Sequence, residues 1–320
     1  MKVATLLETR RENWKELEKL SDELGKFSRR LKPDEVSRFA FLYRAACADL
    51  ALADAYQLPP KTVGYLHRLV GQAHNQLYRS RKFDLASWYK ILLVDVPQRL
   101  FRDRCVQLAF CLFWFTFIGS ALMAYSQDDW AEQVMPTGFT ERLERDFKTP
   151  VGGRDPADNF VMVGFYIRHN TTIGLRCFAW GLLIVPGLYE TLNNALILGA
   201  AFGHMARPDI VQGKNFFEFV TAHGPFELTA IVLAAGAGLR LGVGWLKTNG
   251  LTRRASLLRA AETAMPLMGI SMLLFFFAAL IEGLLSPTTA PYAVKAGVAV
   301  LSSGILMFYF VVLGFPRRIT

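Results

Sequence analysis

The chain has 320 residues, of which 52% are hydrophobic and 20% are charged, and its mean hydropathy is +0.25. That hydropathy is high for a soluble domain of this length and argues against a cytosolic enzyme. The net charge of +9 is concentrated at the start, because residues 1–104 carry +7 and residues 105–320 only +2. Basic residues beside apolar segments follow the positive-inside rule, and no nucleic-acid-binding motif accompanies them. We therefore predict a polar domain joined to a membrane domain, with no nucleic-acid partner.

Three predicted helices form a cytoplasmic bundle over residues 1–83. In each, apolar residues recur every three to four positions with charged residues between them. Pro33 and the Pro59-Pro60 pair separate the helices. The helices are expected over residues 5–32, 34–56 and 62–81.

Residues 84–104 are predicted to form an interfacial elbow helix. The segment around Trp88 and Tyr89 is too apolar for a solvent-exposed helix. Asp95 and Pro97 interrupt it, so it is not expected to span a membrane. Trp and Tyr are typical of headgroup depth, which favours a helix lying on the membrane surface.

A transmembrane domain is predicted over residues 105–320. Residues 105–125 contain no charged residue, and this length matches the hydrocarbon core of a bilayer. The stretch 173–205 is apolar but too long for one ordinary span, with Pro186-Gly187 near its middle. It predicts either a hairpin of two short spans or one helix kinked at Pro186. Further spans are expected at 226–246, 264–285 and 294–315.

The charge bias favours the hairpin. Residues 247–263 hold four basic residues and one acidic residue, so this segment and the Arg317-Arg318 end are expected in the cytoplasm. Residues 126–172 hold eight acidic and five basic residues and are expected to form an external loop, with a short helix near 140–147. A hairpin gives about six spans, with both termini on the cytoplasmic side of a bacterial inner membrane. One kinked helix gives five.

The second half of the chain carries polar residues at defined places within apolar runs. The runs are YIRHNTTIGLRCFAWGLLIVPGLYETLNNALILGAAFGHM (166–205), HGPFELTAIVLAAGAGLRLG (223–242) and IEGLLSP (281–287). They resemble the stage II sporulation protein M family of bacterial integral membrane proteins. The first part is similar to the longer members of that family in NWKELE (13–18), LYRAACADLALA (42–53), YLHRLVGQAH (65–74) and LYRS (77–80).

The resemblance covers most of the chain and implies a multispan membrane protein. In spore-forming bacteria, the family partners cell-wall-degrading proteins during engulfment, and many members come from bacteria that make no spores. The long helical domain at the start departs from the short sporulation form.

Four ionisable residues are expected to meet at one membrane side: His223, Glu227, Glu282 and Lys295. His223 and Glu227 are four residues apart and share a helix face, whereas the other two lie at the facing ends of the last two spans. We predict that at least two of the four side chains lie within hydrogen-bonding reach. Ionisable residues in a membrane suggest a polar cavity for transport or docking, although a cluster that only ties the spans together explains them equally well.

The same cluster is weighed as a metal site. His223 and Glu227 could join His204 or His169, but HGPFE is not the HExxH motif, and no third ligand has diagnostic spacing. The sequence therefore predicts neither a metal nor another cofactor, and it contains no recognisable catalytic motif.

A second polar group is expected in the inner half of the membrane. Glu190 and Arg240 are predicted to form a structural ion pair, since an Arg in a membrane needs a partner. Asn193 and Asn194 are expected to form hydrogen bonds between helices.

Two pairs of glycines at four-residue spacing predict close helix packing. They are Gly199 with Gly203, and Gly238 with Gly242. Such faces allow backbones to approach within one chain, which we favour, or between copies in a homo-oligomer.

The sequence as a whole predicts an all-α polytopic membrane protein. We expect a non-enzymatic inner-membrane scaffold or assembly protein, in contact with membrane lipid and with cell-envelope partner proteins. The alternative is a transporter or channel that uses the polar cluster. An intramembrane metallohydrolase is a weaker third interpretation.

Overall fold

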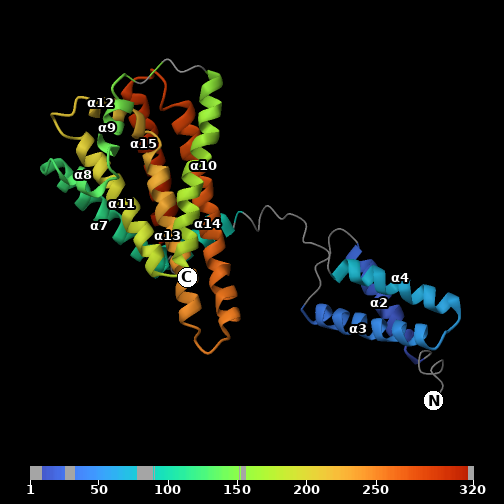
Figure 1. Ribbon diagram of the computed structural model, residues 1–320. Coiled ribbons are helices and arrows are strands. Elements are labelled where there is room, and N and C mark those ends of the chain that lie inside the picture. Colours follow the sequence, from blue (N-terminus) through green and yellow to red (C-terminus); the bar gives the residue numbers. More distant parts are fainter. Residues whose placement is uncertain are drawn as a thin grey trace. The chain divides into compact units, whose positions relative to one another are not determined.

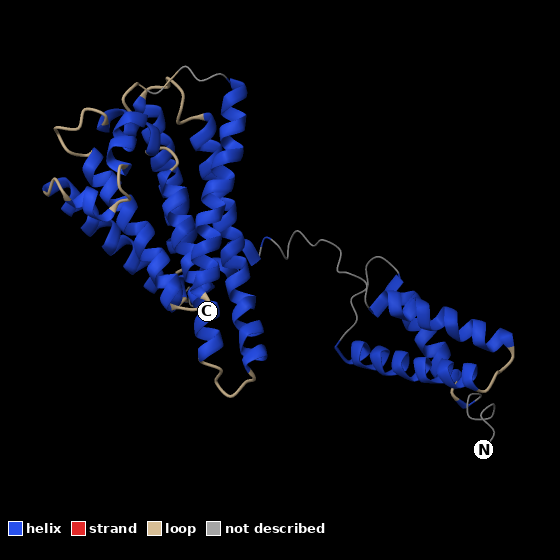
Figure 2. Ribbon diagram, in the orientation of Figure 1, coloured by secondary structure: helices blue, strands red, loops and turns tan. Residues whose placement is uncertain are grey.

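The computed structural model describes residues 9–25, 33–77, 89, 91–150, 152 and 156–315 (Figure 1). These residues form helices and connecting loops, with no strand among them (Figure 2). The prediction of an all-α protein is confirmed. The chain divides into two compact units, Met1–Asp84 and Leu85–Thr320, which are treated separately below.

The first unit contains three packed helices, α2 (Arg11–Gly25), α3 (Pro33–Ala55) and α4 (Pro60–Leu77). Their apolar faces meet in a core that includes Leu17, Phe39 and Leu66. Pro33 and Pro60 stand at the first position of a helix, where a missing N–H breaks no helical hydrogen bond. The remaining parts of the predicted helices, residues 5–8, 26–32 and 78–81, lie outside the described residues.

The segment predicted as an elbow is described at Tyr89 and from Ile91 onward, while Trp88 lies outside the described residues. It forms a single π-helical turn, η1 (Ile91–Asp95), and a short helix, α6 (Val96–Arg102). The side chain of Asp103 accepts the backbone N–H groups of Cys105 and Val106, at 2.8 and 3.3 Å, and so caps the next helix. This cap separates α6 from the first span.

Six long helices build the second unit. They are α7 (Arg104–Ser126), α10 (Pro156–Gly181), α11 (Val185–Met205), α13 (Gly224–Leu246), α14 (Arg253–Leu284) and α15 (Tyr292–Met307), which continues into η2 (Phe308–Val312).

Within the part of the chain that the structure describes, four helices are long and apolar enough to cross a membrane: α7, α13, α14 and the helix formed by α15 with η2. Each has at least 21 residues, which at about 1.5 Å per residue reaches across a hydrocarbon core of about 30 Å. The chain is therefore a polytopic membrane protein. Helices α10 and α11 have similar lengths but contain polar residues such as Arg168, Asn170 and Glu190, so the count of six spans stays a prediction.

Two predicted loops are partly helical. Residues 156–172 belong to α10 rather than to the external loop, because polar side chains on a packed helix resemble a loop in hydropathy. Helix α14 begins at Arg253, capped by the Thr252 hydroxyl, which accepts the Ala255 N–H at 3.3 Å. The loop predicted over 247–263 is therefore limited to residues 247–252.

The break in the long apolar stretch lies earlier than predicted. Residues 182–184 separate α10 from α11, and Ile184 has a φ of +58°. Pro186 lies in the first turn of α11, where proline is well tolerated, instead of at the turn itself. Residues 173–205 therefore lie in two helices and not in one kinked helix.

Three short helices connect the long ones: α8 (Trp130–Val134), α9 (Phe139–Asp146) and α12 (Gly213–Val220). Helices α9 and α12 lie at one end of the bundle, opposite the loop that joins α13 to α14 (Figure 1). Helix α9 matches the predicted helix near 140–147, whereas α12 was not predicted.

Helix α13 forms the centre of the bundle and packs against α7, α10 and α14. Each residue from Ala230 to Leu239 is buried, and all ten are apolar or glycine. A helix that is apolar on all sides is typical of a buried or membrane-spanning position. The middle of α13 is thus buried and apolar.

The four predicted glycines lie at contacts within the chain. A side chain at Gly199 or Gly203 in α11 would overlap the carbonyl of Phe117 or Ala121 in α7. A side chain at Gly238 or Gly242 in α13 would likewise overlap backbone atoms of α10 or of the residues that follow it. Only hydrogen side chains permit these approaches, as expected for small-residue packing in lipid.

Candidate functional site

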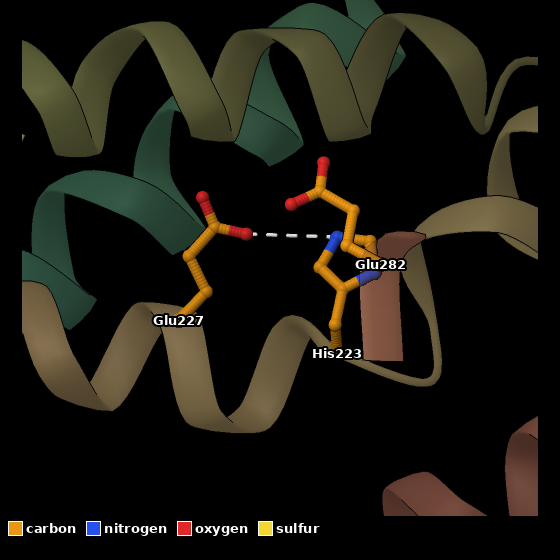
Figure 3. Close-up of side chains that lie close together, drawn as sticks. All are labelled: His223, Glu227 and Glu282. Atoms are coloured by element: carbon orange, nitrogen blue, oxygen red, sulfur yellow. Dashed lines mark ion pairs between the residues drawn. The ribbon is translucent and has the colours of Figure 1, made fainter. Parts of the chain in front are cut away.

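Three of the four predicted cluster residues converge at one end of α13. His223 immediately precedes α13, Glu227 lies in its first turn, and Glu282 lies in the last turn of α14. Figure 3 shows both carboxylates close to the imidazole of His223. The distance from His223 Nε2 to Glu227 Oε2 is 3.5 Å. One nitrogen or oxygen atom from each of the three residues lies within 4.8 Å of the others.

The local sequence explains the positions of the first two. Pro225 stands at the start of α13, and the carbonyl of His223 accepts the N–H groups of Phe226 and Glu227. The helix therefore begins at His223 and places Glu227 one turn further along on the same face. A carboxylate in the first turn is also favoured by the helix dipole.

Hydrogen bonds from α10 and from the loop after α14 orient the site. His223 Nδ1 lies 3.1 Å from the hydroxyl of Ser286, and the Asn170 amide on α10 donates to Glu282 Oε2 at 3.5 Å. Ser286, Asn170 and His223 are all at most 3% exposed. The imidazole Nε2 is thus turned toward Glu227, on the side away from Ser286.

Lys295 belongs to the surroundings of the site and not to its acidic part. Its ammonium group donates to the carbonyls of Ser286 and Thr288, at 2.8 and 2.9 Å, and its side chain is buried. Lys295 therefore holds the loop that carries Ser286, and it reaches His223 only through that residue.

A cavity of about 230 Å³ adjoins the three side chains. His223, Glu227 and Glu282 form one wall, and the remaining wall is mainly apolar and aromatic. Residues of α9, α11, α12 and α13, together with Phe147 just after α9, supply this remainder. It includes Phe139, Phe202, Phe216, Phe219 and Val220.

The charges at this wall are unbalanced. Among the described residues, no Lys or Arg forms an ion pair with Glu227 or Glu282, and the basic group that lies against Glu227 is the imidazole of His223. Two carboxylates in a largely buried position need protons, a cation or donor groups to offset lost hydration. The site can therefore bind a cation or hydrogen-bond donors.

Two regions of the chain match known protein families. Residues 108–287 match the family described as stage II sporulation protein M, which is more than half of the sequence. The chain belongs to the stage II sporulation protein M family. Residues 4–79 match a second family, described only as a domain of unknown function. Searches of curated proteins and of solved structures gave no significant match.

In this stage II sporulation protein M family member, the matched region extends from α7 to the end of IEGLLSP (281–287). It therefore includes His223, Glu227 and Glu282. The resemblance noted for the second half of the sequence is thereby confirmed. The match ends at Pro287, so Lys295 lies beyond it.

The predicted pair of Glu190 and Arg240 is wrong. Arg240 instead contacts the buried Asp103, with 3.2 Å between Arg240 Nε and Asp103 Oδ2. Sequence spacing missed this pair because Asp103 precedes the first apolar span and resembles an ordinary surface carboxylate. Its position as the cap of α7 brings it against the far end of α13.

The predicted hydrogen bonds of the asparagines are mostly local. Asn194 Nδ2 donates to the carbonyl of Glu190 in its own helix at 2.7 Å, with a weak contact of 3.9 Å to Cys177 Sγ on α10. Asn193 is partly buried. Neither residue reaches the site at His223.

Asn170 and Ser286 were not predicted as part of the site. Both lie in the sequence runs that carry the resemblance, Asn170 in 166–205 and Ser286 in 281–287. A single Asn or Ser, however, has no spacing that would mark it as part of a site. Only the packing of α10 and α14 against α13 reveals their contacts.

Proposed function

We propose that this chain is a non-enzymatic membrane scaffold that uses the cavity beside His223 to hold a cell-envelope partner protein. On this proposal the membrane is the bacterial inner membrane, and α9 and α12 face outward. The two termini are then cytoplasmic.

The observation that supports the proposal is the buried, apolar middle of α13. Glu227 and Arg240 lie 13 residues apart on that helix, about 20 Å along its axis. Between them the helix buries only apolar residues and glycine. A transport path would need polar or water-filled surroundings along this distance. The cavity is lined by residues of α9 and α12, which lie at one end of the bundle, as expected for a docking pocket.

The cavity suits a side chain of a partner. Its aromatic walls can bury an apolar group, and its polar wall can fix orientation through a few hydrogen bonds. The family resemblance independently implies protein partners in the cell envelope.

The transporter alternative makes a different prediction, which liposomes can test. Purified full-length protein, reconstituted into liposomes, should conduct neither protons nor alkali cations if it is a scaffold. Conduction that Glu227→Gln abolishes would overturn the proposal.

Partner binding is tested with a matched pair of variants. Val220→Trp adds bulk to the cavity wall, whereas Val300→Trp adds the same group on the exposed surface of α15. The tagged proteins are isolated from the membranes of the native bacterium, and their partners are compared by quantitative mass spectrometry. We expect an envelope protein to be depleted by roughly tenfold with Val220→Trp, equivalent to about 1.4 kcal/mol, and retained with Val300→Trp. Equal recovery of all partners with both variants would contradict the proposal.

A further inference from the structure

We propose that His223, Glu227 and Glu282 bind one divalent transition-metal cation, for which Zn²⁺ is the most direct probe. Imidazole nitrogen and carboxylate oxygen are ordinary ligands for this class of ion. The proposal adds a ligand to the cavity and does not depend on the scaffold function.

The distances suit a single ion. Zn²⁺ lies about 2.0–2.2 Å from nitrogen and oxygen ligands, so two ligands of a tetrahedral site are about 3.3 Å apart. His223 Nε2 and Glu227 Oε2 are already 3.5 Å apart, and the Glu282 oxygen lies within 4.8 Å of both (Figure 3). Small side-chain rotations would complete the triangle of ligands.

The charges also suit a dication. The two carboxylates together carry two negative charges when ionised, and no described Lys or Arg forms an ion pair with either. A bound divalent cation would neutralise both charges in the position where hydration is least available.

The surroundings resemble the outer shell of a metal site. A ligating histidine usually has its second ring nitrogen held by an oxygen, and ligating carboxylates are usually hydrogen-bonded as well. Here Ser286 contacts His223 Nδ1, and Asn170 donates to Glu282. Lys295 in turn holds the carbonyl of Ser286 at 2.8 Å. Two of the three candidate ligands, Glu282 and His223, are therefore positioned by groups on α10 and on the loop after α14.

Three protein ligands leave one coordination position of a tetrahedral ion open. All three ligands line the cavity, so the open position would face it. The fourth ligand would be an oxygen donor, either water or a carboxylate introduced by a molecule in the cavity.

The metal content of the purified full-length protein tests the proposal. The protein is treated with EDTA, exposed to Zn²⁺, dialysed and measured by elemental mass spectrometry. We expect about one Zn²⁺ per chain for the wild type, and a loss of at least about tenfold for His223→Ala, Glu227→Gln or Glu282→Gln. Glu190→Gln, which alters a membrane-domain carboxylate outside the site, should retain the metal.

A second measurement needs no variant and so covers the case in which a variant fails to fold. The wild-type protein is loaded with Co²⁺, and its visible spectrum is recorded before and after addition of Zn²⁺. A four-coordinate spectrum that Zn²⁺ removes supports the site. Retention of no Zn²⁺ by the wild type, equal retention by all variants, or a six-coordinate Co²⁺ spectrum would each overturn the proposal.

Discussion

The contact between α7 and α11 makes a sharp prediction about Gly203. A methyl group added at Gly203→Ala would overlap the carbonyl of Ala121 and come within 2.8 Å of its Cα. Both opposing atoms are backbone, so the helices must separate and cannot adjust by a side-chain rotation. Forcing an added carbon into a close-packed contact typically costs about 1–3 kcal/mol.

The comparison requires a glycine in the same bundle that has free space around it. Gly119 on α7 has no atom within 4 Å of the position that its added methyl group would take. Gly119→Ala therefore reports the helix propensity of alanine alone, a gain of up to about 1 kcal/mol. The difference between the two variants isolates the cost of the overlap.

Thermal denaturation of the detergent-solubilised protein, followed by size-exclusion chromatography, measures this difference. At about 2–4 °C per kcal/mol for a unit of this size, an overlap cost of about 1–3 kcal/mol should make Gly203→Ala melt about 2–12 °C below Gly119→Ala. Equal melting temperatures would refute the close α7–α11 contact. A changed oligomeric state with unchanged stability would assign Gly203 to a contact between copies.

Two further predictions concern the contact of Asp103 with Arg240 and the membrane sides of α9 and of the loop between α13 and α14. Asp103→Ala should lower the free energy of unfolding by about 1–2 kcal/mol, because α7 loses its cap and Arg240 its partner; a thermal scan that matches the wild type would contradict the contact. In a cysteine-free background, a membrane-impermeant thiol reagent applied to intact cells should label Glu141→Cys on α9 and spare Asn249→Cys; labelling of both positions would reject the proposed orientation.

The sequence by itself determined the fold class, the family and most of the helices. An uncharged apolar run of about 20 residues crosses a membrane as a helix, because a helix satisfies the backbone N–H and C=O groups within the segment. The span that becomes α7 could therefore be predicted without knowledge of the tertiary structure. The four-residue spacing of His223 and Glu227 likewise places them on one helix face, whatever surrounds the helix.

Local hydropathy failed where a helix carries polar groups into a packed bundle. The first half of α10 was predicted as a loop because Arg168 and Asn170 resemble loop residues. Asn170 is in fact buried, and its amide contacts Glu282. A polar side chain on a packed helix is satisfied by a partner far along the chain, which no local window contains.

The tertiary structure alone decided which polar groups meet. Arg240 was expected beside Glu190 but contacts Asp103, because the cap of α7 lies against the far end of α13. Glu282 joins His223 although 59 residues separate them, since α13 and α14 run antiparallel and bring their ends together. Pairings of this kind depend on how helices cross and which faces they bury, and the spacing of residues along one helix does not contain that information.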